Sequence, residues 1–196
     1  MSVLLLSRVP VEELGGREIL ISGESHTSVA LLRLLMRDRY QRQVSYVTAQ
    51  VSAALRSATP PVAFLAIGDE ALRLRRHPDY PYRVDLAEAW REWTGLPFIF
   101  GLWVVSRDAA DRGLFRGDPG ELLRRGRDWG LAHMDVILDL TGHGCPLSRQ
   151  DLARYYREGL VFSLGEEELR GLRLFYEKLA HAGLIAAVPQ LRFFEM

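Results

Sequence analysis

The chain has 196 residues, of which 48% are hydrophobic and 26% are charged, as is ordinary for a soluble globular protein. Its 25 basic and 25 acidic residues balance, which argues against a nucleic-acid or membrane-surface role, because both depend on a clustered basic excess. The single cysteine, Cys145, excludes an internal disulfide, and no apolar run reaches the ~18 residues of a membrane span, so we expect a cytoplasmic protein.

The first half of the chain alternates strand-like and helix-like segments. Short apolar runs bounded by turn residues predict strands at residues 3–7, 18–22, 44–47, 62–67, 82–84 and 98–106. Helical spacing of apolar residues predicts helices at 27–40, 50–57, 69–74 and 86–93. This alternation is typical of a mainly parallel sheet with helices on both faces.

The second half is predicted to be almost wholly helical. The helical segments fall at residues 109–115, 119–138, 148–158 and 166–182. Ser148 and Ser163 are expected N-caps, and Gly183 is expected to end the last helix. Because amphipathic helices have to bury their apolar stripes, this half is expected to cover a sheet.

The turn after the second predicted strand is rich in hydroxyl groups. Ser25, Thr27 and Ser28 stand where a helix begins, and a helix N-terminus with added hydroxyl donors suits a carboxylate or a phosphate. The alternative is that Ser25 or Thr27 is simply an N-cap, which the local pattern alone favours. His26 is a candidate acid or base, although a solvated loop histidine is the more common outcome.

Two further segments carry candidate ligand contacts. Asp69 follows a buried strand at the position where open α/β sheets bind ligands, so it is either a contact to a substrate hydroxyl or a helix cap. The aromatic-rich run 98–103 is either a wall over a flat ring or an ordinary core strand, which is locally favoured. We expect no metal, because His133, Asp139, His143 and Cys145 match no zinc spacing.

Five segments together resemble one known family. They are SVLLLSRVPVEEL (2–14), ESHTSVALLRLL (24–35), AFLAIGDEAL (63–72), DLAEAWREWTGLPFIFGLWVVSR (85–107) and LSRQDLARYYREGLVFSLGEEELRGLRLFYEKLAHAGLI (147–185). In order and spacing they resemble the chorismate dehydratase of the futalosine route to menaquinone, a relative of the dihydroxynaphthoate synthase of that pathway. The resemblance implies dehydration of chorismate to 3-enolpyruvylbenzoate without a metal or an organic cofactor.

The resemblance also implies a fold like that of type-II periplasmic binding proteins, with the ligand between two α/β lobes. Residues 1–20 and 104–196 are expected in lobe 1, and residues 21–103 in lobe 2. Thr27 and Ser28 match the hydroxyl pair that meets a substrate carboxylate, and Ser7 and Asp69 fall on positions that face the cleft.

Family members carry an N-terminal segment before the first strand, with a Tyr-Leu-Asn type motif whose asparagine is implicated as the base. Nothing in this chain matches that motif, so the first lobe is expected to be incomplete and the catalytic residue is left unassigned. We therefore predict that the 196-residue chain alone is a poor catalyst. Two alternatives stay open: a cytoplasmic solute-binding-like module for a small carboxylate, and a fragment that pairs with a second copy or another chain.

Overall fold

The computed structural model describes residues 2–23, 25–115, 117–145 and 147–194. The chain divides into two compact units. Unit 1 is formed by Met1–Phe100 and Leu164–Val188, and unit 2 by Gly101–Ser163 and Pro189–Met196. The sheet lies entirely in unit 1, whereas the regular elements described in unit 2 are all helical.

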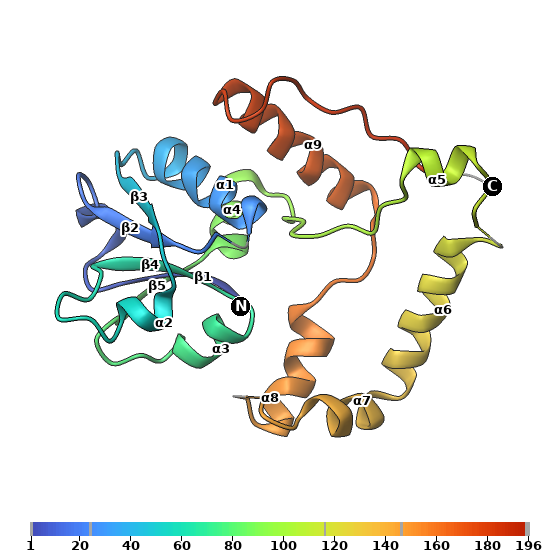
Figure 1. The fold of residues 1–196 in the computed structure, drawn as a ribbon, viewed down its shortest axis with the longest axis horizontal. Coiled ribbons are helices and arrows are strands. Elements are labelled where there is room, and N and C mark those ends of the chain that lie inside the picture. The colour runs from blue at the N-terminus through green and yellow to red at the C-terminus, as the bar shows by residue number, and fades with distance from the viewer. Residues whose placement is uncertain (1, 24, 116, 146, 195–196) are drawn as a thin grey trace. The chain divides into compact units, whose positions relative to one another are not determined.

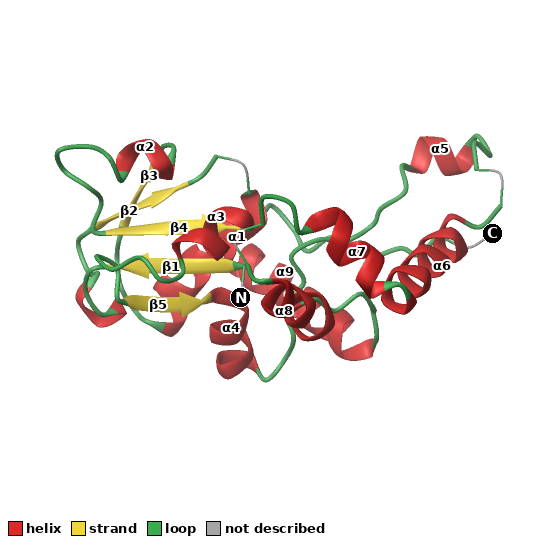
Figure 2. Cartoon of the chain, turned by 90° about the horizontal axis from the view of Figure 1, so that it is seen from below, coloured by secondary structure: helices red, strands yellow, loops and turns green. Residues whose placement is uncertain are grey.

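Unit 1 is built on a five-stranded mixed sheet. Its strands are β1 (Val3–Ser7), β2 (Glu18–Ile21), β3 (Ser45–Thr48), β4 (Ala63–Ile67) and β5 (Tyr82–Asp85). Figure 2 shows them side by side in the order β3-β2-β4-β1-β5. β2 pairs in parallel with β3 and β4, whereas β1 runs antiparallel to β4 and β5. β2, β3, β4 and β5 therefore end at one edge of the sheet, the carboxyl edge, and β1 alone is reversed.

Helices cover both faces of this sheet (Figure 1). The helical elements of unit 1 are η1 (Val11–Glu13, a 3-10 helix), α1 (His26–Leu34), η2 (Leu35–Arg39, a π-helix), α2 (Val51–Ala54), α3 (Asp69–Leu74), α4 (Leu86–Thr94) and α9 (Glu166–His181). Alternate strand residues face opposite sides, so Leu5 joins one core and Leu4 the other. The first core also holds apolar residues of α1, α4 and α9, and the second those of α2 and α3.

The predicted strands of the first half are confirmed except for one. β1 is buried over all five residues, because it has a strand on each side and a helical layer on each face. The strand predicted at 98–106 is wrong, since these residues form no regular secondary structure up to the start of a helix at Arg107. Phe98 instead packs in an aromatic cluster, with its ring centroid 5.5 Å from that of Trp90 and 4.9 Å from that of Phe175. Farther along, Trp103 is 84% exposed, and this segment does not pair with any strand of the described sheet.

The predicted helix ends are confirmed in part. Ser148 caps its helix by accepting a hydrogen bond from the backbone N–H of Asp151. Gly183 ends α9 with φ of +68°, a left-handed conformation that glycine adopts without strain. The expected cap at Ser163 is wrong, because the helix begins later, after Gly165, whose N–H donates to Glu168 Oε2 at 2.9 Å.

Unit 2 contains α5 (Arg107–Asp111), α6 (Pro119–Ala132), α7 (Met134–Thr141), α8 (Arg149–Arg154) and η3 (Tyr155–Gly159, a π-helix). The single helix predicted over 119–138 is broken at His133, whose backbone is not helical (φ −116°, ψ 42°). No residue of α6 is buried. Among the described residues of unit 2, the buried apolar side chains are those of Met134, Leu138, Leu147 and Leu152.

The two units divide the chain differently from the expected lobes. The lobe boundary expected after residue 20 falls inside unit 1, because β1 fills the gap between β4 and β5 and so joins the same sheet as the later strands. The boundary expected after residue 103 lies close to the end of the first segment of unit 1 at Phe100. The fold is thus mixed α/β, with its single described sheet in unit 1.

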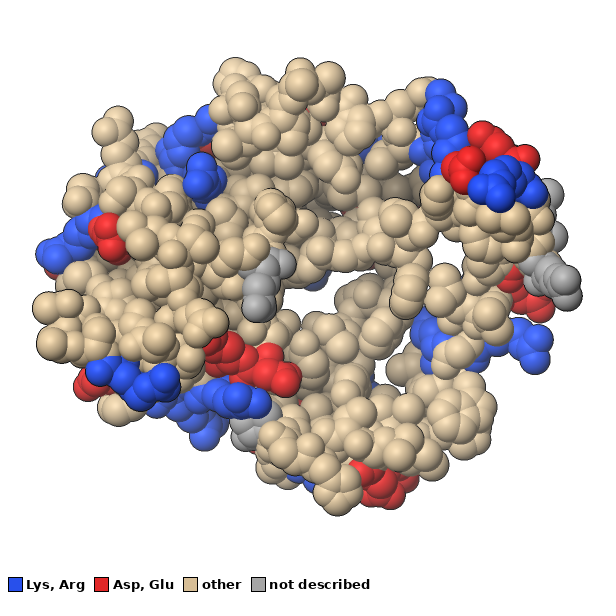
Figure 3. Space-filling view, viewed as in Figure 1, with Lys and Arg blue, Asp and Glu red and all other residues tan. Residues whose placement is uncertain are grey.

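Charged side chains form small groups of both signs on the face shown in Figure 3, and they gather into no continuous basic patch there. No described helix combines the length and the apolar character that crossing a membrane requires.

Candidate functional site

Four helices of unit 1 begin at the carboxyl edge of the sheet. α1 follows β2, α2 follows β3, α3 follows β4 and α4 follows β5. The first turn of a helix carries backbone N–H groups without intrahelical acceptors and the positive end of the helix dipole. This edge therefore favours a bound anion.

The two longest of these helices differ in how their N-termini are satisfied. Asp85 caps α4, and its Oδ1 accepts hydrogen bonds from the N–H groups of Ala87 and Glu88 at 3.0 and 3.2 Å. α1 has no acidic residue in its first turn, and its cap is the neutral hydroxyl of Ser25. A carboxylate of the chain thus already occupies the N-terminus of α4, whereas the described first turn of α1 contains no acidic side chain.

The first turn of α1 is held by two serines. Ser25 Oγ accepts a hydrogen bond from the N–H of Ser28 at 3.3 Å and donates one to Ser28 Oγ at 2.9 Å. Ser28 is buried, whereas Thr27 is half-buried and His26 is exposed. Among the described residues, the Thr27 hydroxyl has no hydrogen-bond partner. The atoms that remain available to an anion are the Thr27 hydroxyl and the N–H groups of His26 and Thr27, which helix geometry leaves without an intrahelical acceptor.

This geometry separates the roles expected for the hydroxyl groups. From the sequence, either Ser25 or Thr27 was a candidate N-cap of this helix. The structure shows that Ser25 is the N-cap and that Thr27 is not. Ser28 is held against Ser25 by two hydrogen bonds, so it fixes the shape of the turn. Of Thr27 and Ser28, Thr27 is the one whose hydroxyl group remains available for a contact. That either residue binds a carboxylate stays a prediction.

Asp69 lies at the same edge of the sheet as Thr27. β4 pairs with β2, so the start of α3 and the start of α1 follow neighbouring strands. Asp69 is the first residue of α3 and is exposed, and the N-cap is Gly68, so the alternative in which Asp69 caps this helix is wrong. Gly68 has φ of +58° and ψ of −130°, a conformation that residues with a Cβ rarely adopt. Its N–H donates to the carbonyl of Ser2 at 2.7 Å.

Ser2 therefore joins this edge, and sequence reasoning did not single it out. The strand β1 begins at the carboxyl edge because it is reversed, with Val3 opposite Ile67, the last residue of β4. The signal in the sequence was a serine directly before a strand that begins with four apolar residues. The edge of the sheet on which this serine lies depends on the direction of the strand, and local pattern does not give that direction.

The structure does not bring Ser7 together with the other candidates. Ser7 ends β1 opposite Ala63 and Tyr82, the first residues of β4 and β5, so it lies at the opposite edge of the sheet. Its side chain is buried, and its hydroxyl donates to the carbonyl of Val9 at 2.7 Å. This contact holds the turn after the strand.

Comparison with known proteins places the chain in a family. A sequence profile described as menaquinone biosynthesis matches residues 1–181. The chain belongs to the menaquinone biosynthesis family. It is 27% identical over 191 residues to a 1,4-dihydroxy-6-naphthoate synthase of Thermus thermophilus, covering 95% of this chain and 68% of that protein. It is 28% identical over 182 residues to a chorismate dehydratase of the same organism, covering 82% of this chain and 62% of that protein. The chain thus spans about two thirds of the length of these two relatives.

The histidines and the cysteine of this menaquinone biosynthesis protein form no metal centre among the residues that the structure describes, where no three His, Cys, Asp or Glu side chains gather. Asp139 is instead ion-paired with Arg149, which also contacts Asp135 at 3.2 Å. The His133 ring stacks on the indole of Trp129, with centroids 4.5 Å apart and planes inclined by 15°. Asp139 and His133 thus have partners on the helices of unit 2.

Proposed function

We propose that this chain acts in menaquinone biosynthesis as the substrate-binding part of a chorismate dehydratase, a hydro-lyase that forms 3-enolpyruvylbenzoate from chorismate. Two findings support the proposal: the family to which the chain belongs, and the relative that carries this activity in its name. The single observation in the structure that carries it is the N-terminus of α1, where donors face the carboxyl edge and no acidic residue of the first turn occupies them.

We propose a two-lobe fold of the type-II periplasmic-binding-protein kind, in which the sheet of unit 1 belongs to one lobe. The reversed strand β1 supports this topology. It starts at the carboxyl edge and runs away from it, so the chain enters this sheet from the side on which a ligand would bind. A chain that crosses between two lobes has to enter in this way.

In the proposed reaction the residues of this chain position the substrate. The Thr27 hydroxyl and the N–H groups of His26 and Thr27 hold one carboxylate of chorismate, and the Asp69 carboxylate accepts a hydrogen bond from its hydroxyl group. A proton then leaves the carbon next to the hydroxyl-bearing one, and water is expelled as the ring becomes aromatic. Fixing the substrate lowers the entropic part of the barrier, and a base near the acidic proton completes the chemistry. No residue of this chain is assigned as that base, and the chemistry as proposed takes place in the cytoplasm without a cofactor.

The test begins with binding. Chorismate is titrated calorimetrically into the purified 196-residue chain and into the variant Thr27→Val, with Thr141→Val in α7 as a matched control. We expect Thr27→Val to weaken binding about tenfold or more, because a hydrogen bond to a charged group contributes roughly 1.5–3 kcal/mol. The control is expected to bind as the parent chain does. Equal affinities for all three proteins would contradict the proposed site.

Turnover is then followed by mass-resolved chromatography of 3-enolpyruvylbenzoate. We expect little product from this chain alone and more when the third of the dehydratase relative that it does not span is added as a separate polypeptide. Binding of chorismate without product in both mixtures would favour the alternative, a module that holds a small carboxylate without chemistry. Normal turnover by the 196-residue chain would overturn the prediction that it lacks an essential group.

A further inference from the structure

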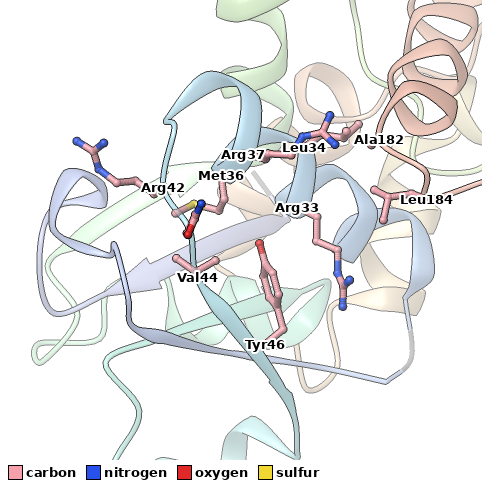
Figure 4. Close-up of a pocket in the computed structure, with 10 residues that line it drawn as sticks. Arg33, Leu34, Met36, Arg37, Arg42, Val44, Tyr46, Ala182 and Leu184 are labelled. Atoms are coloured by element: carbon pink, nitrogen blue, oxygen red, sulfur yellow. The ribbon is translucent and has the colours of Figure 1, made fainter.

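A pocket lies in unit 1 beside the C-terminal end of α1 (Figure 4). It has a volume of about 290 Å³ and lies beside the last turn of α1, the π-helix η2, the start of β3 and the segment after α9. Its lining is Arg33, Leu34, Met36, Arg37, Arg42, Gln43, Val44, Tyr46, Ala182 and Leu184. Every lining residue belongs to unit 1, and none belongs to the carboxyl edge described above.

The charged side chains that line this pocket are all cationic. Its lining contains three arginines and no carboxylate side chain. Arg37 is neutralised by Asp38, with Nη2 2.9 Å from Oδ2, and this hydrogen bond lowers the pKa of Asp38. Arg42 donates to the carbonyl oxygens of Glu12 and Gln41, at 2.8 and 3.1 Å, which fix its position without cancelling its charge.

Arg33 is the cation most open to a ligand. Among the described residues it has no acidic partner, and its guanidinium lies 4.8 Å from the centroid of the Tyr46 ring. Stacking on an aromatic face restrains the guanidinium while leaving its N–H donors directed outward, where they match the two oxygens of a carboxylate. Figure 4 shows this guanidinium beside the Tyr46 ring.

The rest of the pocket is apolar. Leu34 and Met36 are buried beneath it, and Val44 and Leu184 line its sides. Burial raises the pKa of Tyr46 to about 12, so its phenol stays neutral and keeps its O–H as a donor. A ligand that satisfies both parts therefore has an anionic head and an apolar body. Phosphate satisfies only the first part.

The backbone around this pocket is unusual at two points. α1 passes into the π-helical turn Leu35–Arg39, which carries Met36 and Arg37, and such turns recur at functional sites. Gln41, directly before Arg42, has φ of +53°, which is uncommon for a residue other than glycine. Arginines near the end of a helix also complement its dipole, which explains their position. It does not explain the ring contact of Arg33 or the apolar lining.

We propose that this pocket binds a small carboxylate with a flat apolar body of about the size of benzoate, at a site separate from the N-terminus of α1. The volume is at the lower end of the range for small-molecule sites, which fits a single ring with one carboxylate. Arg33 holds the carboxylate, Tyr46 donates a hydrogen bond, and Leu34, Met36 and Leu184 contact the ring.

The proposal is tested with benzoate as the probe and the full 196-residue chain. Binding is followed by NMR through the Nε–Hε resonance of Arg33, and the dissociation constant is measured for the parent chain, Arg33→Gln, Tyr46→Phe and Thr27→Val. The matched control is Arg73→Gln, an exposed arginine on α3. We expect Arg33→Gln to weaken binding about tenfold or more, because a charge-assisted contact is lost, and Tyr46→Phe to weaken it by a smaller factor. Arg73→Gln and Thr27→Val are expected to bind as the parent chain does.

Three results would overturn the proposal. Benzoate could leave the Arg33 resonance unmoved at ~10 mM, a concentration at which even a weak site with a millimolar dissociation constant is mostly filled. Binding could survive Arg33→Gln in a protein whose circular dichroism matches the parent. It could also be lost in Thr27→Val, which would place benzoate at the carboxyl edge. Tyr46→Phe keeps the ring that supports Arg33 and removes only the phenol hydroxyl. If Arg33→Gln fails to fold, the dissociation constant of benzoate for Tyr46→Phe still tests the site.

Discussion

Units 1 and 2 contain helices of similar character but bury them very differently. α9 in unit 1 packs Leu172, Phe175 and Leu179 into buried positions, whereas α6 in unit 2, of comparable length, buries no residue. Most of the exposed large apolar side chains lie in unit 2, among them Leu122 at 71% and Leu140 at 72% exposure. An amphipathic pattern therefore forms a helix in both units, but it stabilises the fold only where a surface receives the apolar face.

The sheet is the reason for this difference. In unit 1 both sheet faces receive helices, so strand and helix side chains bury one another. Among the described residues, unit 2 has no strand to offer such a face. Large exposed apolar areas on a protein mark interaction surfaces, ligand-binding grooves or sites of aggregation.

The largest contrast is expected from removing one aromatic ring in each unit. Phe175→Ala should lower the free energy of unfolding by about 3–5 kcal/mol, because the ring is buried against Trp90 and Phe98 and its loss leaves a cavity. Phe162→Ala in unit 2 should change it by less than about 1 kcal/mol, since that ring is 52% exposed. Urea unfolding followed by circular dichroism measures both. Similar losses for the two variants would mean that unit 2 has a core of its own.

Adding one methyl group in each unit is expected to change stability by less, and to change it in opposite directions in the two units. A Cβ on Gly171 of α9 would lie 2.2 Å from the carbonyl oxygen of Pro97, so Gly171→Ala should destabilise unit 1 by about 1–3 kcal/mol. A Cβ on Gly126 of α6 would meet nothing within 4 Å, so Gly126→Ala should raise helicity and stabilise α6 by about 0.5–1 kcal/mol. Melting temperature and far-ultraviolet circular dichroism record the two changes. Stabilisation by Gly171→Ala would show that α9 does not pack on Pro97 in solution.

The smallest effect is expected from alkaline pH acting on unit 1. Burial raises the pKa of Tyr46 to about 12, so the folded chain holds this proton more tightly than the unfolded chain, whose value is about 10. The resulting stabilisation is complete below pH ~10 and is lost as the pH rises from there through about 12. Tyr46→Phe should therefore lose less unfolding free energy than the parent chain between pH ~9 and ~11.5. Urea titrations across this range, with the exposed Tyr82→Phe as control, measure it, and parallel pH profiles for parent and Tyr46→Phe would contradict it.

Local pattern was sufficient for most elements of unit 1, because their apolar periodicity and their packed environment agree. It failed at 98–106, where the residues have strand propensity but do not pair with any strand of the described sheet, and pairing is not a local property. The role of Ser7 rests on the family resemblance and stays a prediction; that Ser7 lies at the opposite edge of the sheet from Thr27 and Asp69 follows from the direction of its strand, which local pattern does not give. The family was recognisable because it is carried by ordered segments rather than by any single residue.

The helix N-terminus on which the candidate site rests could be predicted from the sequence, but its side-chain contacts could not. A hydroxyl-rich turn before an apolar helix signals an N-terminal site, and the structure contains that helix with its first turn at the carboxyl edge. Which serine caps and which hydroxyl remains available depend on side-chain directions within one turn. Asp69 could not be separated from a cap by sequence, because the decision rests on the positive φ of Gly68, which lets α3 begin without a side-chain cap.

The central position of β1 also dictates when unit 1 is able to fold. Residues 3–7 pair with residues 63–67 and 82–85, and Phe175 and Leu179 of α9 join the same core. During synthesis the first strand therefore pairs only after much later residues have been made. The face of the sheet on which α9 packs is covered only in part, by α1 and α4, until α9 has been made. Such long-range pairing slows folding and leaves apolar strands open to aggregation in the meantime. A ribosome-bound chain that ends before Glu166 should accordingly depend on chaperones far more than the complete 196 residues do.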